Sequence, residues 1–155
     1  MRVKVDVVAA QAEHIPYIAA HMRQADQDEI WAARRLTPER ALKMSLGLST
    51  HAWTGFVNGT PAVMFGVGAI SIMGGIGAPW LLGTDAVERH FVSFLRGSRI
   101  WLSAIQNAYP VLQNIVDDRN TVSKRWLQWL GFTMRDPIQV GTGVFRPFDL
   151  RKTDV

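Results

Sequence analysis

The stretch from Ala52 to Thr84 contains no charged side chain, and this feature constrains the fold more than any other. Within it, the segment from Pro61 to Leu82 is long enough to cross a bilayer on length alone. Such a run forms either a membrane helix or a group of buried strands. The turn signals inside the run decide between these two structures.

Those signals favour strands. Asn58-Gly59 is a strong two-residue hairpin signal between residues 51–57 and 61–70. Glycines and Pro79 then divide the rest of the run into strands and turns. We therefore expect a buried hairpin and a third strand, Trp80-Leu81-Leu82, at the centre of a sheet, and no membrane span.

The segments that flank the run predict one further strand and three helices. Valines alternate with charged residues over residues 3–8, which is typical of a strand with one buried face. Residues 12–33 fit one amphipathic helix, and Thr37-Pro38 is a good start for a short second helix. A long helix is expected from Thr84 or Asp85 to Tyr109-Pro110, with Asp85 as its cap and Gly97 weakening its middle.

The segment from Val111 to Phe132 predicts a tight strand and helix unit. A short apolar strand is followed by a polar turn, and Asn120 is placed to cap the next helix. Gly131 then ends that helix. Helical spacing predicts its buried face as Val122, Trp126, Trp129 and Leu130. Two last strands, residues 133–140 and 143–149, are expected to follow.

Composition excludes several classes of protein. The chain has no cysteine, so disulfides and thiolate metal sites are absent, and its four histidines lack the spacing of a metal motif. The net charge of +4 is spread along the chain in runs no longer than two basic residues, which argues against nucleic acid as the main partner. The amino terminus lacks the apolar stretch of a secretory signal.

The unit from Val111 to Phe132 resembles the last motif of the GNAT (Gcn5-related N-acetyltransferase) superfamily. The shared features are Asn120 at the helix start, Ser123 three positions on, and the ending Leu130-Gly131-Phe132. The order of predicted elements is also that of a GNAT domain. The resemblance implies a single α/β (α+β) domain over residues 1–155. Its mixed, mostly antiparallel sheet would have about seven strands and about four flanking helices.

Residues 60–132 also resemble the small internal virion proteins of tailed bacteriophages, which look like degenerate GNAT domains. Two segments carry this resemblance, Trp80-Leu81-Leu82-Gly83-Thr84-Asp85 and Asn120-Thr121-Val122-Ser123. It implies a phage-derived protein, located in the host cytoplasm or in the virion, with virion or assembly proteins as partners.

The GNAT resemblance further implies acetyl-CoA as the cofactor. The residues expected to contact it are Ala78, Trp80, Leu82, Gly83, Thr84, Asn120 and Ser123. In the family, a glycine-rich loop binds the pyrophosphate through backbone N–H groups. This chain keeps only Gly83 there and has Asp85 where the phosphate would lie. A capping carboxylate would occupy those donors and repel the anion, so acetyl-CoA is predicted to bind weakly or not at all.

The family's catalytic residues are mostly missing. The position of the usual tyrosine acid holds Leu127. Asp26, Asp28 and Glu29 fall where the family has a wall of its acceptor pocket, so they are interpreted either as an amine-binding group or as a solvated helix face. Two hypotheses remain open: an acetyltransferase-like protein without activity, and an active acetyl-CoA-dependent N-acyltransferase of unknown acceptor.

Overall fold

The computed structural model describes residues 3–152 and contains one eight-stranded sheet. The strands are β1 (Val5–Ala9), β2 (Ser49–Val57), β3 (Thr60–Ser71), β4 (Ile76–Gly83), β5 (Val111–Asp117), β6 (Thr133–Met134), β7 (Ile138–Val140) and β8 (Gly143–Arg151). The helices are the 3-10 helix η1 (Ala12–His14) and the α-helices α1 (Ile15–Ala20), α2 (Gln24–Arg34), α3 (Pro38–Leu48), α4 (Asp85–Arg89), α5 (Phe91–Ala108) and α6 (Thr121–Trp129).

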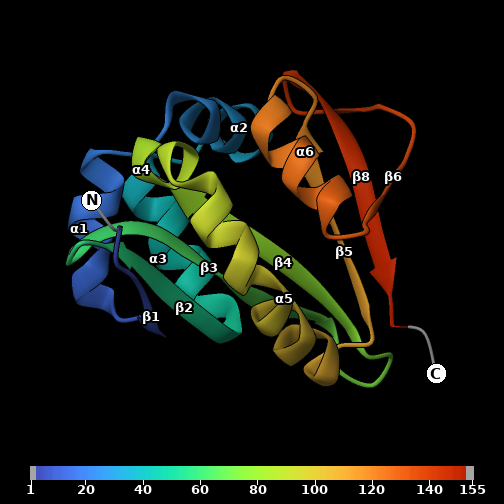
Figure 1. Cartoon of the computed structure of the whole chain (residues 1–155). Helices are drawn as coiled ribbons and strands as arrows, with labels where there is room; N and C mark the ends of the chain where they lie inside the picture. Colours follow the sequence, from blue (N-terminus) through green and yellow to red (C-terminus); the bar gives the residue numbers. More distant parts are fainter. Residues whose placement is uncertain (1–2, 153–155) are drawn as a thin grey trace.

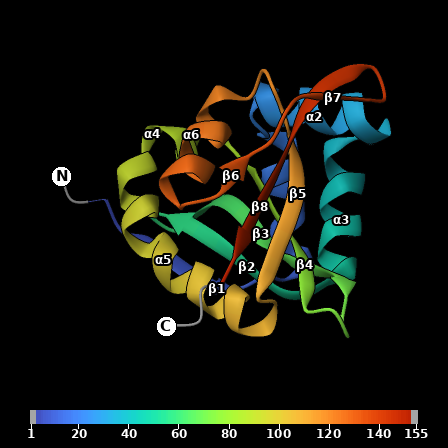
Figure 2. The same ribbon diagram turned by 90° about the vertical axis from the view of Figure 1, so that its right-hand side faces the viewer.

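The strand order is β1-β2-β3-β4-β5-β8-β6, and β7 also pairs with β8. Only β4 and β5 run parallel, so the sheet is mixed and mostly antiparallel. Helices α1 to α3 cover one face, and α4 to α6 cover the other (Figures 1 and 2). This arrangement confirms the predicted α/β fold. Its larger number of elements arises because two predicted helices and one predicted strand are each divided.

The charge-free run forms β2, β3 and β4, as the turn signals predicted. Asn58 and Gly59 have φ angles of 48° and 81°, the left-handed values that a tight hairpin turn requires. Ala62, Val63 and Met64 of β3 are completely buried. No helix within residues 3–152 is long and apolar enough to span a membrane.

The single helix expected over residues 12–33 is wrong. It divides into η1, α1 and α2, because Met22 and Arg23 leave helical geometry to join the sheet. Met22 forms an isolated β-bridge with Thr84, and the Arg23 N–H donates to the Gly83 carbonyl over 2.9 Å. The backbone therefore uses those donors and acceptors in a sheet contact rather than in a helix.

The long helix is also divided, and its cap is not the predicted residue. The break between α4 and α5 falls at His90, while Gly97 lies inside α5. Thr84 caps α4, because its Oγ1 accepts from the Ala86 N–H over 3.3 Å. Asp85 is the first helical residue, and its side chain is exposed.

The cap and the end of α6 are confirmed, but its predicted buried face is partly wrong. Asn120 Oδ1 accepts from the Ser123 N–H over 3.4 Å, and Gly131 has a left-handed φ of 98°. Trp126 is partly buried and packs edge-on against Phe91. Trp129 is 44% exposed.

The strand predicted over residues 133–140 is interrupted. Its two ends form β6 and β7, which both pair with β8 but at separate places along it. Pro137 lies between them and has no N–H to donate to a ladder. The single-domain prediction over residues 1–155 includes termini outside the described residues and stays a prediction.

Candidate functional site

The sheet opens between its two central strands. β4 and β5 pair only at Ile76–Val111 and Gly77–Leu112, and then diverge towards their carboxyl ends (Figure 1). Asn114 bridges the gap near its narrow end, where its Nδ2 donates to the Pro79 carbonyl over 2.7 Å. The rest of the gap has no strand to fill it.

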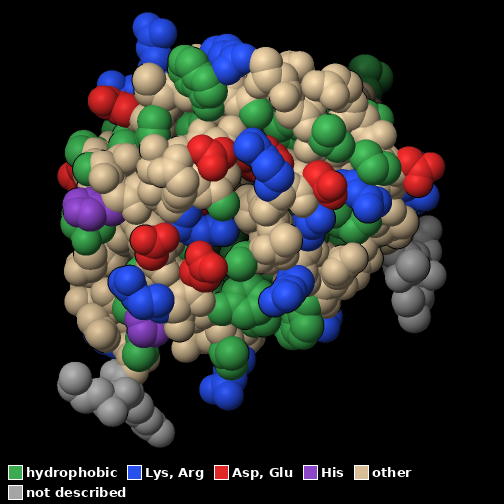
Figure 3. All heavy atoms as spheres, turned by 90° about the horizontal axis from the view of Figure 1, so that it is seen from above, with side chains coloured by type: hydrophobic (Ala, Val, Ile, Leu, Met, Phe, Trp, Pro, Cys, Tyr) green, Lys and Arg blue, Asp and Glu red, His purple; other side chains and the backbone are tan. Residues whose placement is uncertain are grey.

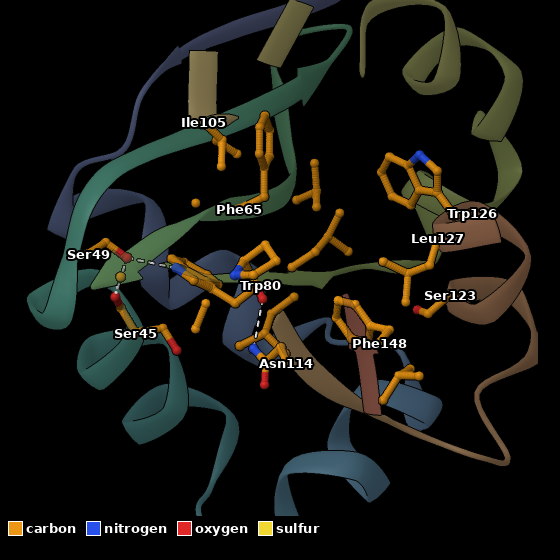
Figure 4. A pocket seen from close by; sticks show the side chains of 18 of the residues that line it. Ser45, Ser49, Phe65, Trp80, Ile105, Asn114, Ser123, Trp126, Leu127 and Phe148 are labelled. Carbon is orange, nitrogen blue, oxygen red and sulfur yellow. Dashed lines mark hydrogen bonds between the residues drawn. The ribbon is translucent and has the colours of Figure 1, made fainter. Parts of the chain in front are cut away.

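A channel of about 680 Å³ occupies this gap and reaches both faces of the sheet. On one face it lies between α2 and α3, and on the other between α5 and α6 (Figure 4). Its wall is mainly apolar and includes Phe65, Leu82, Ile105, Trp126, Leu127 and Phe148. A channel of this size and character suits an extended ligand with few charges.

The edge of β4 offers backbone hydrogen bonds to this channel. In an antiparallel pair, the N–H and the carbonyl of one residue point to the same side of the strand, and those of the next residue point to the other side. The carbonyl of Pro79 and the N–H of Gly83 are both bonded on the side away from β3. Pro79, Leu81 and Gly83 are alternate residues of β4. The N–H and the carbonyl of Leu81 therefore also point away from β3, into the channel.

The Trp80 side chain is fixed as part of the channel wall. Its Nε1 donates to Ser49 Oγ over 2.7 Å, and Ser49 Oγ donates to the Ser45 carbonyl over 2.6 Å (Figure 4). These bonds hold the indole between β4 and α3. Trp80 therefore shapes the channel without presenting its N–H to a ligand.

The wide end of the gap is closed by a buried polar group, which we call the Asp26 junction: Arg23, Asp26, Gly83 and Asn120. Asp26 Oδ2 accepts from the Gly83 N–H over 3.0 Å, and its Oδ1 accepts from Arg23 Nη1 over 3.2 Å and Asn120 Nδ2 over 3.3 Å. Arg23 Nη2 also donates to Asn120 Oδ1 over 3.2 Å. Burial raises the pKa of Asp26, while Arg23 and the Gly83 N–H oppose this rise.

The junction changes the interpretation of the loop between β4 and α4. The Gly83 N–H is bonded to Asp26, the Thr84 N–H donates to the Ala62 carbonyl, and the Ala86 N–H donates to Thr84 Oγ1. Three of the N–H groups that could bind a phosphate, those of Gly83, Thr84 and Ala86, are thus already bonded. The carboxylate that occupies the loop is Asp26, from α2, and not Asp85.

Glu29 is a second acidic residue of α2; unlike the buried Asp26 it is only partly buried, and it lines the channel. Its Oε1 accepts from the Asp117 N–H over 2.7 Å, which fixes α2 to the end of β5. Burial is the main reason that the pKa of Glu29 rises to about 7, and the Asp26 carboxylate adds to this rise. The interpretation of these acidic residues as a solvated helix face is therefore wrong for Asp26 and Glu29, although Asp28 is exposed.

The position of the expected acid supplies no proton donor. Leu127 lines the channel beside Trp126. Among the described residues, Trp126 Nε1 is buried without a hydrogen-bond partner. An indole N–H is a donor that does not titrate in the physiological range. Trp126 and Leu127 can therefore supply no proton to a ligand in the channel.

The residues predicted to contact a cofactor separate into two groups. Ala78, Trp80, Leu82 and Ser123 line the channel. Gly83 and Asn120 belong to the Asp26 junction, and Thr84 caps α4. The sequence does not predict Asn114, whereas Leu81 lies in the strand, residues 78–82, along which the arm of the cofactor is expected. Asn114 gives one signal, since it is a polar residue within an apolar strand.

Other kinds of site find little support in the part of the chain described. No group of three or more histidine, aspartate or glutamate side chains within residues 3–152 is arranged to bind a metal ion. Viewed onto the wide end of the gap, acidic and basic side chains are interspersed over the surface (Figure 3). They form no uniform basic patch there of the kind that binds nucleic acid.

Solved structures share this architecture. The yncA acetyltransferase of Salmonella typhimurium, solved with its cofactor acetyl-CoA, matches with a TM-score of 0.72 and 14% identity over 98% of this chain and 96% of that one. An N-acetyltransferase from Staphylococcus aureus Mu50 also has a TM-score of 0.72 at 14% identity, over 96% and 98% of the two chains. The ribosomal-protein-S18-alanine N-acetyltransferase of Escherichia coli reaches 0.66 at 14% identity, over 98% and 96%.

The fold is therefore that of the GNAT acetyltransferases. At these identities the likeness establishes the fold alone, because one fold supports different functions. No protein-family model matches the sequence, and no curated protein matches it.

Proposed function

We propose that this protein binds the acyl-pantetheine arm of an acyl thioester in the channel between β4 and β5, and that it transfers the acyl group to an amine. The observation that carries the proposal is the divergence of these strands after two paired residues, which leaves the backbone of Leu81 facing an apolar channel. An arm with amide groups could continue the sheet along this edge, as an added strand does.

The two parts of a CoA molecule fit this site differently. The channel has the volume and the apolar wall for the arm and a small acyl group. The nucleotide end would require donors for its pyrophosphate, and the N–H groups of Gly83, Thr84 and Ala86 are already bonded within the protein. The acyl thioester is therefore held mainly by its arm, and the nucleotide adds little affinity.

Calorimetric titration with acetyl-CoA and with S-acetylpantetheine tests this division. We expect the two ligands to bind with affinities within about tenfold of one another, because a tenfold difference is about 1.4 kcal/mol and the nucleotide finds few free donors. Failure of both ligands to bind would overturn the proposal. Much tighter binding of acetyl-CoA would show that other donors hold the phosphates.

A pair of α6 variants provides the control. Ser123 lines the channel, whereas Thr121, two residues earlier on the same helix, is exposed and does not. Ser123→Trp should block the channel and abolish binding, and Thr121→Trp should bind like the wild type. Equal binding by both variants would place the ligand elsewhere.

A second candidate function is acyl binding without turnover. One observation favours it, namely the leucine at position 127, where the family resemblance implies a tyrosine acid. It agrees with the resemblance to phage internal virion proteins, which implies phage origin and virion or assembly partners. Thiol release from S-acetylpantetheine, measured with a set of primary amines, distinguishes the two functions. Binding without amine-dependent thiol release would favour the second candidate.

A further inference from the structure

The two edges of the sheet differ in what they offer to another chain. At one edge, the short strands β6 and β7 pair with β8 at separate places along it. The other edge is β1, a continuous strand that pairs with β2 alone among the described strands (Figure 1). An edge strand presents a row of unpaired N–H and carbonyl groups, so β1 is the place where the sheet can be extended.

The hydrogen bonds between β1 and β2 show which backbone groups of β1 point outward. The Lys4 carbonyl accepts from the Asn58 N–H over 2.8 Å, so the even-numbered residues of β1 direct their polar backbone groups to β2. The N–H and carbonyl groups of Val3, Val5 and Val7 therefore point to the open side. Within residues 3–152, no hydrogen bond reaches these outward groups.

Two charged side chains of opposite sign lie along this edge. Successive side chains of a strand point to opposite faces of the sheet, so Lys4 and Asp6 share one face. They are 76% and 50% exposed, and Lys4 Nζ lies 3.7 Å from Asp6 Oδ2. An exposed ion pair of this kind contributes little within one molecule. Both side chains are therefore available to a partner that pairs with β1.

Charge selects the register in which a second copy of the chain can pair with this edge. Antiparallel pairing about a two-fold axis places one residue opposite its own copy. An axis at Lys4 or at Asp6 would place like charges opposite each other, which is unfavourable. An axis at Val7 would place Asp6 opposite the partner's Val8 and form no ion pair. An axis at Val5 places Lys4 opposite the partner's Asp6, and it does so twice by symmetry.

We propose that β1 is a homodimer interface, in which two copies of the chain pair their β1 strands antiparallel about Val5 and join their sheets into one. This interface is independent of the proposed acyl transfer. The axis at Val5 also lets Val5 exchange both backbone hydrogen bonds with the partner's Val5, because these groups point outward. Valine favours the extended backbone that such pairing requires. The contact is smaller than a typical stable interface, so the dimer should form at high protein concentration.

Sedimentation velocity at low salt, over a range of protein concentrations, tests the dimer. The wild type should self-associate. Asp6→Lys and Lys4→Asp should each weaken self-association by about tenfold or more, because both facing pairs become pairs of like charge. An equal mixture of these two variants should recover the association, since the acidic residues of one variant then face the basic residues of the other.

Asp136→Lys is the matched control for the change of charge. Asp136 is exposed and lies between β6 and β7, away from β1. This variant should associate like the wild type. A wild type that is monomeric at every concentration would overturn the inference. Self-association that Asp6→Lys leaves unchanged, or a mixture of the two β1 variants that stays monomeric, would overturn it as well.

Hydrogen exchange identifies the strand that pairs. The N–H groups of Val5 and Val7 should become protected as the protein concentration rises. The N–H of Asp6 points to β2 in the monomer, so its protection should change little. A dimer whose new protection falls in the turn between β3 and β4, where Ile72 and Met73 are exposed, would place the contact there and exclude the β1 interface.

Discussion

At the scale of single residues, Asn120 shows how one side chain can serve two purposes. The sequence predicts a helix cap, and the structure confirms it. The same amide also donates to Asp26 and accepts from Arg23, so it is 2% exposed within a charged junction. A cap alone would tolerate aspartate, but in this junction an aspartate would lose the bond that the Asn120 amide donates to Asp26.

We expect both Asn120→Ala and Asn120→Asp to destabilise the protein by about 2–4 kcal/mol. Alanine leaves Asp26 and Arg23 with an unmade bond each, and aspartate places a second carboxylate beside Asp26. Urea unfolding near neutral pH measures both losses. Asn120→Asp should recover stability in mild acid, where a protonated carboxyl can donate to Asp26. A nearly neutral Asn120→Asp would show that only the cap matters.

Among the residues of the site, sequence analysis could predict those whose role depends on local spacing. Asn120, Ser123 and the strand ending in Leu82 are recognised from patterns of a few residues. The contacts of Asp26 with Gly83 and of Glu29 with Asp117 join segments far apart in the chain. No local pattern encodes such contacts. Local spacing therefore predicts a loop occupied by the carboxylate of Asp85, whereas the carboxylate bonded to the loop is that of Asp26.

At the scale of elements, helical periodicity predicted α6 but not which tryptophan it buries. Trp126 faces the channel and Phe91. Trp129 turns outward, where the Arg99 guanidinium lies 4.7 Å from the centre of its ring. A residue at the edge of an apolar stripe can satisfy helical spacing and still face solvent when a neighbouring helix supplies a cation.

Alanine substitutions separate the two tryptophans. Trp126→Ala should cost about 3 kcal/mol, the lower end of the range for aromatic residues in a core, because the channel already limits its packing. Trp129→Ala should cost about 1 kcal/mol or less, since an exposed cation–π contact contributes little. Thermal or urea unfolding of both variants measures this. Equal losses would mean that α6 buries both residues alike.

The cap of α4 determines what a substitution of Asp85 can change. Because Thr84 caps α4 and Asp85 is exposed, Asp85→Gly frees no buried donor. We expect this variant to bind acetyl-CoA no better than the wild type in a calorimetric titration. A clear gain in affinity would mean that the Asp85 charge itself repels the ligand.

At the scale of the whole molecule, two sets of carboxylates act on stability in opposite directions. The pKa values of Asp118 and Asp149 are lowered, mainly by hydrogen bonds from Lys124 and Arg135, so their contribution is present near neutral pH and lost in acid. Glu29 is the opposite case, because its pKa rises from 4.5 to about 7 on folding. Its charged form is disfavoured in the fold, and stability decreases as the pH rises across that interval.

The free energy of unfolding should therefore be greatest in mild acid, between these two effects. From about pH 5 to about pH 8 we expect the wild type to lose on the order of 2 kcal/mol through Glu29. Glu29→Gln should lose less over the same range and be the more stable protein at the upper end. Urea unfolding at several pH values checks this, and parallel curves for the two proteins would contradict it.

The Asp26 junction also sets a competition for any anion that approaches the loop. A side chain attached to the fold has a high effective concentration at its partner, whereas a ligand competes only at its concentration in solution. A phosphate could accept from the Gly83 N–H only in the fraction of molecules in which Asp26 has withdrawn. If that fraction were about 1%, the apparent affinity would be about a hundredfold below the intrinsic one. Asp26 therefore acts as an intramolecular competitor for the Gly83 N–H, and its effective concentration does not change when the protein is diluted.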